Sequence, residues 1–333
     1  MRPFRYERAG DAGQAVALLA AEPEAKFLGG GTNLVDLMRL GVETPRTLID
    51  VSRLQDHGRI EETADGGLRI GAAVSNSDLA ADPRVCARYP VLSSAVLHGA
   101  SGQLRNLATV GGNLLQRTRC PYFQDVTKPC NKREGARDRG RCPAREGDHR
   151  NLAILGHSEL CVATNPSDLA VALAALEATV HVQGASGSRA IPIPGLHRLP
   201  GDAPDRDTVL EPGELITAVE LARRRGPDSR QRYRKVRERR SFAFALVSIA
   251  VVLELDGDAV ADVRIALGGV AHAPWRATRA EAALRGAPVT EASAARAAEV
   301  ELEQAQPLRD NGYKLEIARN LITRTLLELA EAG

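Results

Sequence analysis

The chain has 333 residues, of which 44 are Lys or Arg and 42 are Asp or Glu, so its formal net charge is +2. This length corresponds to about two domains. The hydrophobic fraction of 44% and the charged fraction of 26% are typical of a folded globular protein, not of a disordered one. The near-zero charge gives no overall indication of nucleic-acid binding, and five cysteines are too few for a disulfide scaffold.

Membrane insertion is not expected, because no apolar run approaches the ~20 residues of a spanning helix. The N-terminus carries three arginines, but the apolar stretch 15–21 that follows is short and runs into Glu22. An amphipathic helix is therefore a better interpretation than a signal peptide. We expect a chain without an export signal of its own, either cytoplasmic or carried to the periplasm with a partner subunit.

The first part of the chain alternates between helical and strand patterns. Ser75 is the expected N-cap of a helix that begins near Asn76. The other elements expected here are helices at 11–21, 33–40 (closed by Gly41) and 90–98, and strands at 26–28, 47–51 and 68–72.

The helical and strand patterns are interrupted at 117–150 by a polar segment without periodicity. Further along, a basic stretch at 223–240 indicates a domain joint. Beyond the joint, two strands linked by the turn 256–258 and three helices predict an α+β domain with an antiparallel sheet. The elements expected in this half are strands at 178–182, 215–221, 244–255 and 259–268, helices at 169–177, 275–284, 291–305 and 311–332, and a loop at 192–212.

Two glycine-rich loops indicate an anion site. The segment 27–33 reads Phe-Leu-Gly-Gly-Gly-Thr-Asn, and the segment 109–113 reads Thr-Val-Gly-Gly-Asn. Glycine lets successive backbone N–H groups converge on a phosphate, and a following helix adds its positive end. Neither loop is a Rossmann or Walker motif. Each could be a simple tight turn, but two such loops favour a dinucleotide held between two lobes.

The segments 26–38, 48–50, 104–114 and 165–168 carry a resemblance to a known family. They resemble the FAD-binding subunits of the molybdenum hydroxylases, the family of xanthine dehydrogenase, carbon monoxide dehydrogenase and aldehyde oxidoreductase. The resemblance covers the whole chain, including Lys235 and the C-terminal part.

The resemblance implies an α+β fold. A two-lobed FAD-binding domain of the vanillyl-alcohol-oxidase/PCMH type is expected at 1–225, with lobes at about 1–55 and 56–225. A smaller α+β domain of the CO dehydrogenase flavoprotein type, with a three-stranded antiparallel sheet and helices, is expected at 228–333.

The resemblance also implies which residues hold FAD. The loop 29–34 would wrap the pyrophosphate, the second loop would bind the phosphate and ribityl side, and Asp168 would contact the polar chain or the ring edge. Lys235 would approach the carbonyl edge of the ring and favour the reduced, anionic flavin. Lys235 could equally lie on a solvated charged face. The implied FAD-binding residues are Lys26, Phe27, Leu28, Gly29, Gly30, Gly31, Thr32, Asn33, Leu34, His98, Gly99, Thr109, Gly112, Asn113, Asp168, Leu215, Ile216 and Lys235.

An insertion at about 117–161 contains four of the five cysteines. A disulfide pair, a structural zinc site and an iron–sulfur cluster are all conceivable, and the wide spacing leaves iron–sulfur only slightly ahead of zinc. The segment 117–150 carries a net charge of +5, which would suit a negatively charged cluster. The segments 113–123, 129–133 and 153–156 resemble a subgroup that serves bacterial aldehyde oxidoreductases and binds an extra 4Fe-4S cluster. That resemblance implies Cys120, Cys130, Cys142 and Cys161 as ligands, and leaves Cys86 as a structural thiol.

The function implied is that of an electron-transfer flavoprotein subunit of a heteromeric molybdenum-dependent aldehyde oxidoreductase. Its partners would be a large molybdenum-cofactor subunit and a small 2Fe-2S subunit, and its FAD would pass electrons to an external acceptor. No catalytic acid or base is expected in this chain. The alternatives are a stand-alone flavin reductase or oxidase with a structural zinc site, and a scaffold that only docks partners.

Overall fold

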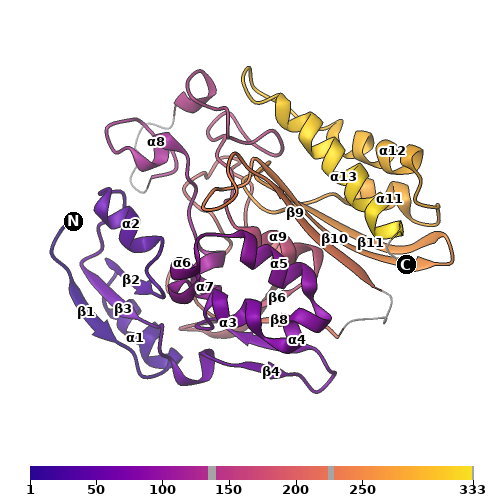
Figure 1. Ribbon diagram of the computed structural model, residues 1–333. Helices are drawn as coiled ribbons and strands as arrows, with labels where there is room; N and C mark the ends of the chain where they lie inside the picture. Colours follow the sequence, from indigo (N-terminus) through magenta and orange to yellow (C-terminus); the bar gives the residue numbers. More distant parts are fainter. Residues whose placement is uncertain (134–139, 224–228, 332–333) are drawn as a thin grey trace.

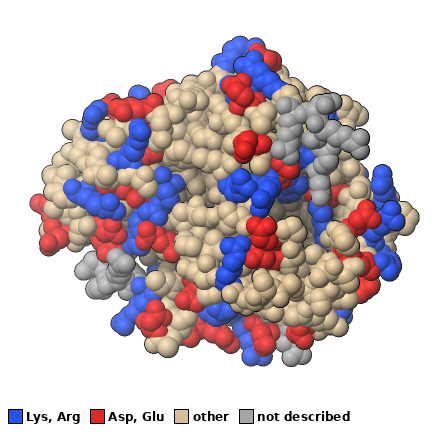
Figure 2. Space-filling view, turned by 180° about the vertical axis from the view of Figure 1, so that it is seen from behind, with Lys and Arg blue, Asp and Glu red and all other residues tan. Residues whose placement is uncertain are grey.

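The computed structural model describes residues 1–133, 140–223 and 229–331. Three sheets organise this part of the chain, with three, five and four strands. Figure 1 shows the N-terminal lobe on one side of the molecule and the C-terminal helices on the other. Basic and acidic side chains are interspersed on the face in Figure 2, as the balanced total charge leads one to expect. No helix in the described ranges has the length and apolar character needed to cross a membrane.

The N-terminal lobe is a small parallel sheet with the strand order β1-β3-β2. Asp11 caps the first helix by accepting a hydrogen bond from the Gln14 backbone N–H at 2.7 Å. Buried Ala15 and Val16 pack this helix against the sheet. The elements are β1 (Arg5–Arg8), α1 (Ala12–Ala21), β2 (Ala25–Leu28), α2 (Leu34–Arg39) and β3 (Thr47–Asp50).

The second lobe is an antiparallel sheet with the order β4-β5-β8-β6-β7, covered by short helices. Every residue of its central helix α9 is buried, because α9 lies between this lobe and the C-terminal sheet. The strands are β4 (Ile60–Glu62), β5 (Leu68–Gly71), β6 (Thr179–Gly184), β7 (Gly187–Pro192) and β8 (Leu215–Leu221). The helices are α3 (Asn76–Ala81), α4 (Pro83–Arg88), α5 (Pro90–His98), α6 (Gly102–Leu107), α7 (Val110–Leu114), α9 (Asp168–Ala175) and α10 (Ile193–Leu196).

The C-terminal domain has an antiparallel sheet, as predicted, with the order β12-β11-β10-β9. It contains four strands where three were expected, because a two-residue strand pairs with β11. Three helices pack on one face of this sheet (Figure 1). The elements are β9 (Arg230–Val236), β10 (Val247–Asp256), β11 (Ala259–Gly268), β12 (Trp275–Arg276), α11 (Thr278–Leu284), α12 (Glu291–Leu302) and α13 (Tyr313–Glu331).

The basic segment 223–240 contains a strand that the sequence did not predict. The interpretation as a simple joint is wrong for 230–236, which form the edge strand β9 beside β10. The strand is hard to recognise because Tyr233 and Val236 are its only apolar residues, so the apolar alternation typical of a strand is missing. Arg230 donates to the Leu329 carbonyl and Arg234 pairs with Glu328, both at the end of α13. The predicted boundary itself, at 225–228, lies outside the described residues.

The insertion is also more ordered than expected. Its described part contains the short helix α8 (Pro121–Gln124), a 3-10 turn at Pro143–Arg145, and a small core. Phe123 and Ala144 are fully buried, and Leu37 of the N-terminal lobe packs in the same core. The prediction that this segment lacks regular structure is therefore wrong for 121–124 and 143–145, while the rest of its described part is irregular.

Lys314 at the start of α13 links the end of the insertion to the C-terminal domain through hydrogen bonds. Its side chain is fully buried, and Nζ donates to the carbonyls of Asn151 at 2.9 Å, Leu152 at 3.0 Å and Gly269 at 2.7 Å. Three acceptors match the three N–H donors of an ammonium group. Burial lowers the pKa of Lys314 to about 7.

We expect Lys314→Met to lower the free energy of unfolding by about 1–3 kcal/mol, because buried carbonyls lose their donor. Between pH 7 and the ordinary lysine value near 10.5, the unfolded chain binds more protons than the folded one. The wild-type stability should therefore rise across this window relative to that of the variant. Urea unfolding at pH 7 and pH 9 measures both effects. Arg319→Met, at an exposed position of α13, is the control, and an equal stability difference at both pH values would contradict the account.

Candidate functional site

A cavity of about 880 Å³ lies between the two lobes and reaches the C-terminal domain. This volume is in the upper part of the ~300–1,000 Å³ range of ligand pockets. Both glycine-rich loops line it. The lining residues among those predicted to bind FAD are Gly30, Gly31, Thr32, Asn33, Gly99, Gly112, Asn113, Asp168 and Lys235.

Glycine is required where the two loops meet. A Cβ on Gly30 would lie 1.7 Å from the Leu107 carbonyl oxygen, and a Cβ on Gly29 would lie 2.8 Å from Thr109 Oγ1. Gly31 has φ of 73°, a conformation that side chains other than glycine rarely adopt. The first loop therefore lies directly against the backbone that leads into the second loop, and this contact forms part of the cavity wall.

Two buried amides in the cavity wall have atoms without a partner among the described residues. Asn33 Oδ1 accepts the Arg117 backbone N–H at 2.9 Å, which leaves Nδ2 as an unpaired donor. Asn76, at the start of α3, has an unpaired Oδ1 acceptor. Unpaired buried polar atoms are costly. They fit a ligand with both acceptors and donors, such as the phosphates and the adenine or ribose groups of a dinucleotide.

The charged end of the cavity is formed by Asp168 and Lys235. Lys235 Nζ donates to Asp168 Oδ2 at 2.7 Å and to the His98 carbonyl at 3.2 Å. The Lys235 side chain is 1% exposed, so it does not lie on a solvated face. Two of its three N–H donors are used by these groups, which leaves one for a ligand. His98 thus contributes its carbonyl to the site.

The structure does not bring the other predicted residues to the cavity wall. Lys26 forms an ion pair with Glu43. Leu215 and Ile216 lie in β8 and are 6% and 3% exposed, because they pack into the cores of the two lobes. The remaining predicted residues are adjacent to the loops in the chain or belong to them: Phe27 and Leu28 in β2, Leu34 in α2, Gly29 in the first loop, and Thr109, whose Oγ1 accepts the Gly112 N–H.

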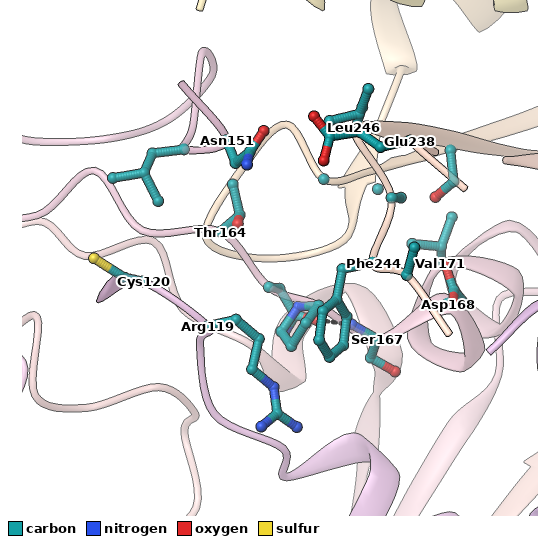
Figure 3. A pocket seen from close by; sticks show the side chains of 18 of the residues that line it. Arg119, Cys120, Asn151, Thr164, Ser167, Asp168, Val171, Glu238, Phe244 and Leu246 are labelled. Atoms are coloured by element: carbon teal, nitrogen blue, oxygen red, sulfur yellow. Dashed lines mark hydrogen bonds between the residues drawn. The ribbon is translucent and has the colours of Figure 1, made fainter. Parts of the chain in front are cut away.

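A second cavity of about 500 Å³ adjoins the first and is lined in part by residues of the insertion (Figure 3). Arg119, Asp168 and Phe244 line both cavities. The Arg119 guanidinium lies 5.0 Å from the centre of the Phe244 ring, close enough for a cation–π interaction. Cys120 lines the opposite side of this cavity (Figure 3). The second cavity therefore lies between the charged end of the first and the cysteines.

The four cysteines of the insertion line one small cavity of about 10 Å³. All are free thiols. Burial raises the pKa of Cys120 to about 11 and that of Cys161 to about 12. Cys86 is also free and lies apart in α4, exposed to solvent, so it is not a core thiol.

Within the described ranges, no three Cys, His, Asp or Glu side chains are grouped closely enough to hold a single metal ion. An iron–sulfur cluster is larger than one ion and spaces its thiolate ligands more widely. The donor set of four thiols fits a cluster, but the gap between them is small, so the thiols would have to turn outward to admit one.

A buried charge network connects the insertion to both lobes. Lys132 is 1% exposed, and its Nζ donates to Asp207 and to the Pro204 carbonyl. Arg117 donates to Asp207 at 2.8 Å and to Glu43 at 2.9 Å. Burial opposes the charge on Asp207, but Lys132 and Arg117 hold the pKa of this carboxyl well below its usual range. This network places a fixed cation close to Cys161.

The sequence did not single out several residues of the site. Asn76 was named only as a helix start, and Arg119 only as one charge of the insertion. Tyr233 was not named at all, although it stands two positions before Lys235. Residues at i and i+2 of a strand share a face, so recognition of β9 would have pointed to it.

The fold combines two lobes and a C-terminal antiparallel sheet around a cavity whose wall contains two glycine-rich loops. Residues 2–223 match the family of the FAD binding domain in molybdopterin dehydrogenase, and residues 231–329 match the CO dehydrogenase flavoprotein C-terminal domain. The chain is 48% identical over 330 residues to the aldehyde oxidoreductase FAD-binding subunit PaoB of Escherichia coli K12, with 98% of each chain covered. It is 28% identical to the carbon monoxide dehydrogenase medium chain of Hydrogenophaga pseudoflava, over 97% of this chain and 96% of the relative.

Solved structures show the same fold. A chain of carbon monoxide dehydrogenase from Hydrogenophaga pseudoflava superposes with a TM-score of 0.76 at 26% identity, over 99% of this chain and 98% of that one. A chain of quinoline 2-oxidoreductase from Pseudomonas putida 86 gives a TM-score of 0.75 at 23% identity, over 99% of this chain and 98% of that one. The protein therefore belongs to the FAD-binding subunits of the molybdenum hydroxylases. This confirms the predictions of the fold class, of FAD as a cofactor and of an oxidoreductase subunit.

We expect Gly30→Ala to abolish stoichiometric FAD binding, because the added Cβ would collide with the Leu107 carbonyl and push the loops apart. The flavin-to-protein ratio of the purified chain measures this loss. Gly195→Ala is the matched control, since a Cβ there meets no atom within 4 Å. A full complement of FAD in the Gly30 variant would contradict the role assigned to the loop contact.

Proposed function

We propose that this chain is the FAD subunit of a heteromeric aldehyde oxidoreductase. A large molybdenum-cofactor subunit would oxidise the aldehyde, a small 2Fe-2S subunit would carry the electrons, and this chain would pass them through FAD to an external acceptor. The observation that carries the proposal is the end-to-end match, at 48% identity, to a subunit named for aldehyde oxidoreductase. The cavity between the lobes supports it, because its wall combines both glycine loops with a buried carboxylate–ammonium pair.

The residues of this chain would bind and tune the cofactor and would not act as acid or base. Asn33 would donate its free N–H to the diphosphate, and the loop contact at Gly30 would exclude water from it. Lys235 would direct its remaining donor toward the flavin. FAD supplies the capacity to collect two electrons and to release them.

We further propose that the four cysteines of the insertion bind a 4Fe-4S cluster. Support comes from their position around one small cavity. Cys120 lines this cavity and also the second cavity, which adjoins the proposed flavin site. The buried cation Lys132 would offset the negative charge of four thiolates. Because burial raises the pKa of the Cys120, Cys142 and Cys161 thiols, assembly of the cluster would release protons and depend on pH. Part of the insertion's charge (Glu134, Arg137, Asp138 and Arg139) lies outside the described residues.

Serine at Cys120, Cys130, Cys142 or Cys161 should each remove most of the iron and sulfide from the anaerobically purified protein. The FAD content should stay unchanged, because none of these side chains lines the cavity between the lobes. Cys86→Ser is the matched control and should keep its iron. About four iron and four sulfide per chain are expected for the wild type. Wild-type protein with FAD but no iron, or with one zinc per chain, would contradict the cluster.

The function is tested by purifying the complex through a tag on this chain. Molybdenum-containing and 2Fe-2S subunits should copurify, and an aldehyde should bleach the visible flavin absorbance of the complex. The chain purified alone should contain FAD that no aldehyde reduces. Turnover by the isolated chain would instead support a stand-alone flavin reductase or oxidase, and a chain without flavin would support the scaffold.

A further inference from the structure

Tyr233 of the C-terminal domain inserts into the FAD-binding domain. The residue belongs to β9, yet its side chain is 4% exposed and packs in the core of the second lobe. The centroid of its ring lies 5.7 Å from the centroid of the His98 ring. The His98 ring is hydrogen-bonded through Nδ1 to the Ser94 carbonyl. These contacts fix the phenol ring, and Tyr233 itself does not line the cavity between the lobes.

The Tyr233 hydroxyl donates to Asp168 Oδ1 at 2.5 Å, while Lys235 donates to Asp168 Oδ2 at 2.7 Å. Both donors come from one face of β9, so a single strand holds both oxygens of the carboxylate. Asp168 also lines the cavity between the lobes. Its neighbour Ser167 donates to Asn113 of the second glycine loop at 2.7 Å. The position of Asp168 is thus determined jointly by β9 and by the loop.

A hydrogen bond from a phenol withdraws negative charge from a carboxylate. Burial and the charge on Asp168 raise the pKa of Tyr233 well above its usual value, so the hydroxyl stays a donor across the physiological pH range. Lys235 alone would have to balance Asp168 if this donor were lost. The wall of the cavity would then present more negative charge to any group beside it.

We propose that Tyr233 is a positioning residue that acts on the flavin through Asp168, holding this carboxylate in place and reducing the negative charge it presents to the ring. The inference rests on the proposed position of the flavin ring beside Asp168 and Lys235. Reduction adds negative charge to a flavin, so a more negative neighbour makes reduction less favourable. Tyr233 therefore raises the reduction potential of FAD in this chain.

The test is Tyr233→Phe in the complex purified through this chain. At a fixed potential we expect the ratio of reduced to oxidised FAD to fall about tenfold, which equals about 30 mV for a two-electron couple. FAD content should be unchanged, because Tyr233 does not line the cavity. Tyr89→Phe is the matched control: Tyr89 is 3% exposed, and its hydroxyl donates to the Ala222 carbonyl at 2.8 Å, outside the cavity wall. The Tyr89→Phe substitution should leave the reduction potential of FAD unchanged.

A double-mutant cycle separates this role from a purely structural one. Asp168→Asn should raise the potential by removing a negative charge, and Tyr233→Phe should have no further effect in that background, because its partner charge is absent. An unchanged potential in Tyr233→Phe, additive shifts in the double variant, or loss of FAD from Tyr233→Phe would each overturn the inference. Absence of FAD from the wild type would instead overturn the proposed function.

Discussion

Asp168 is the group on which the arrangement of the two domains around the cavity depends. It begins α9, the fully buried helix between the second lobe and the C-terminal sheet, and it accepts hydrogen bonds from two side chains of β9. A buried carboxylate is costly unless it is paired and hydrogen-bonded. Lys235 and Tyr233 meet this requirement, and in doing so they bring the edge strand of one domain to the ligand cavity of the other.

Another part of the cavity wall depends on shape. Gly30 approaches the Leu107 carbonyl so closely that no side chain fits between the loops, and the amide of Asn33 is left with a donor that no described residue uses. A tight backbone contact thus forms one end of the site, and a buried ion pair forms the other. A dinucleotide with a charged diphosphate and a redox-active ring is the kind of ligand that suits two such different ends.

Much of the site could be predicted from the sequence, because glycine loops and short polar motifs have local signatures. Residues of the segments 29–33, 109–113 and 165–168 line one cavity. Leu215 and Ile216 were expected beside the flavin, but they pack into the cores, since an apolar pair in a strand has no signature that separates a ligand contact from core packing. β9 was missed because polar residues fill both of its faces and leave no apolar alternation, and Tyr233 was missed with it. The four cysteines line one cavity, which spacing alone could not establish.

The most direct test of this account is an experimental structure of the complex with FAD bound. The account predicts the diphosphate within hydrogen-bond distance of Asn33 Nδ2, beside Gly30 and Gly31, and the flavin ring next to Asp168 and Lys235. The Tyr233 hydroxyl should remain on Asp168 in that structure. A diphosphate remote from both glycine loops, or a flavin ring remote from the Asp168–Lys235 pair, would contradict it.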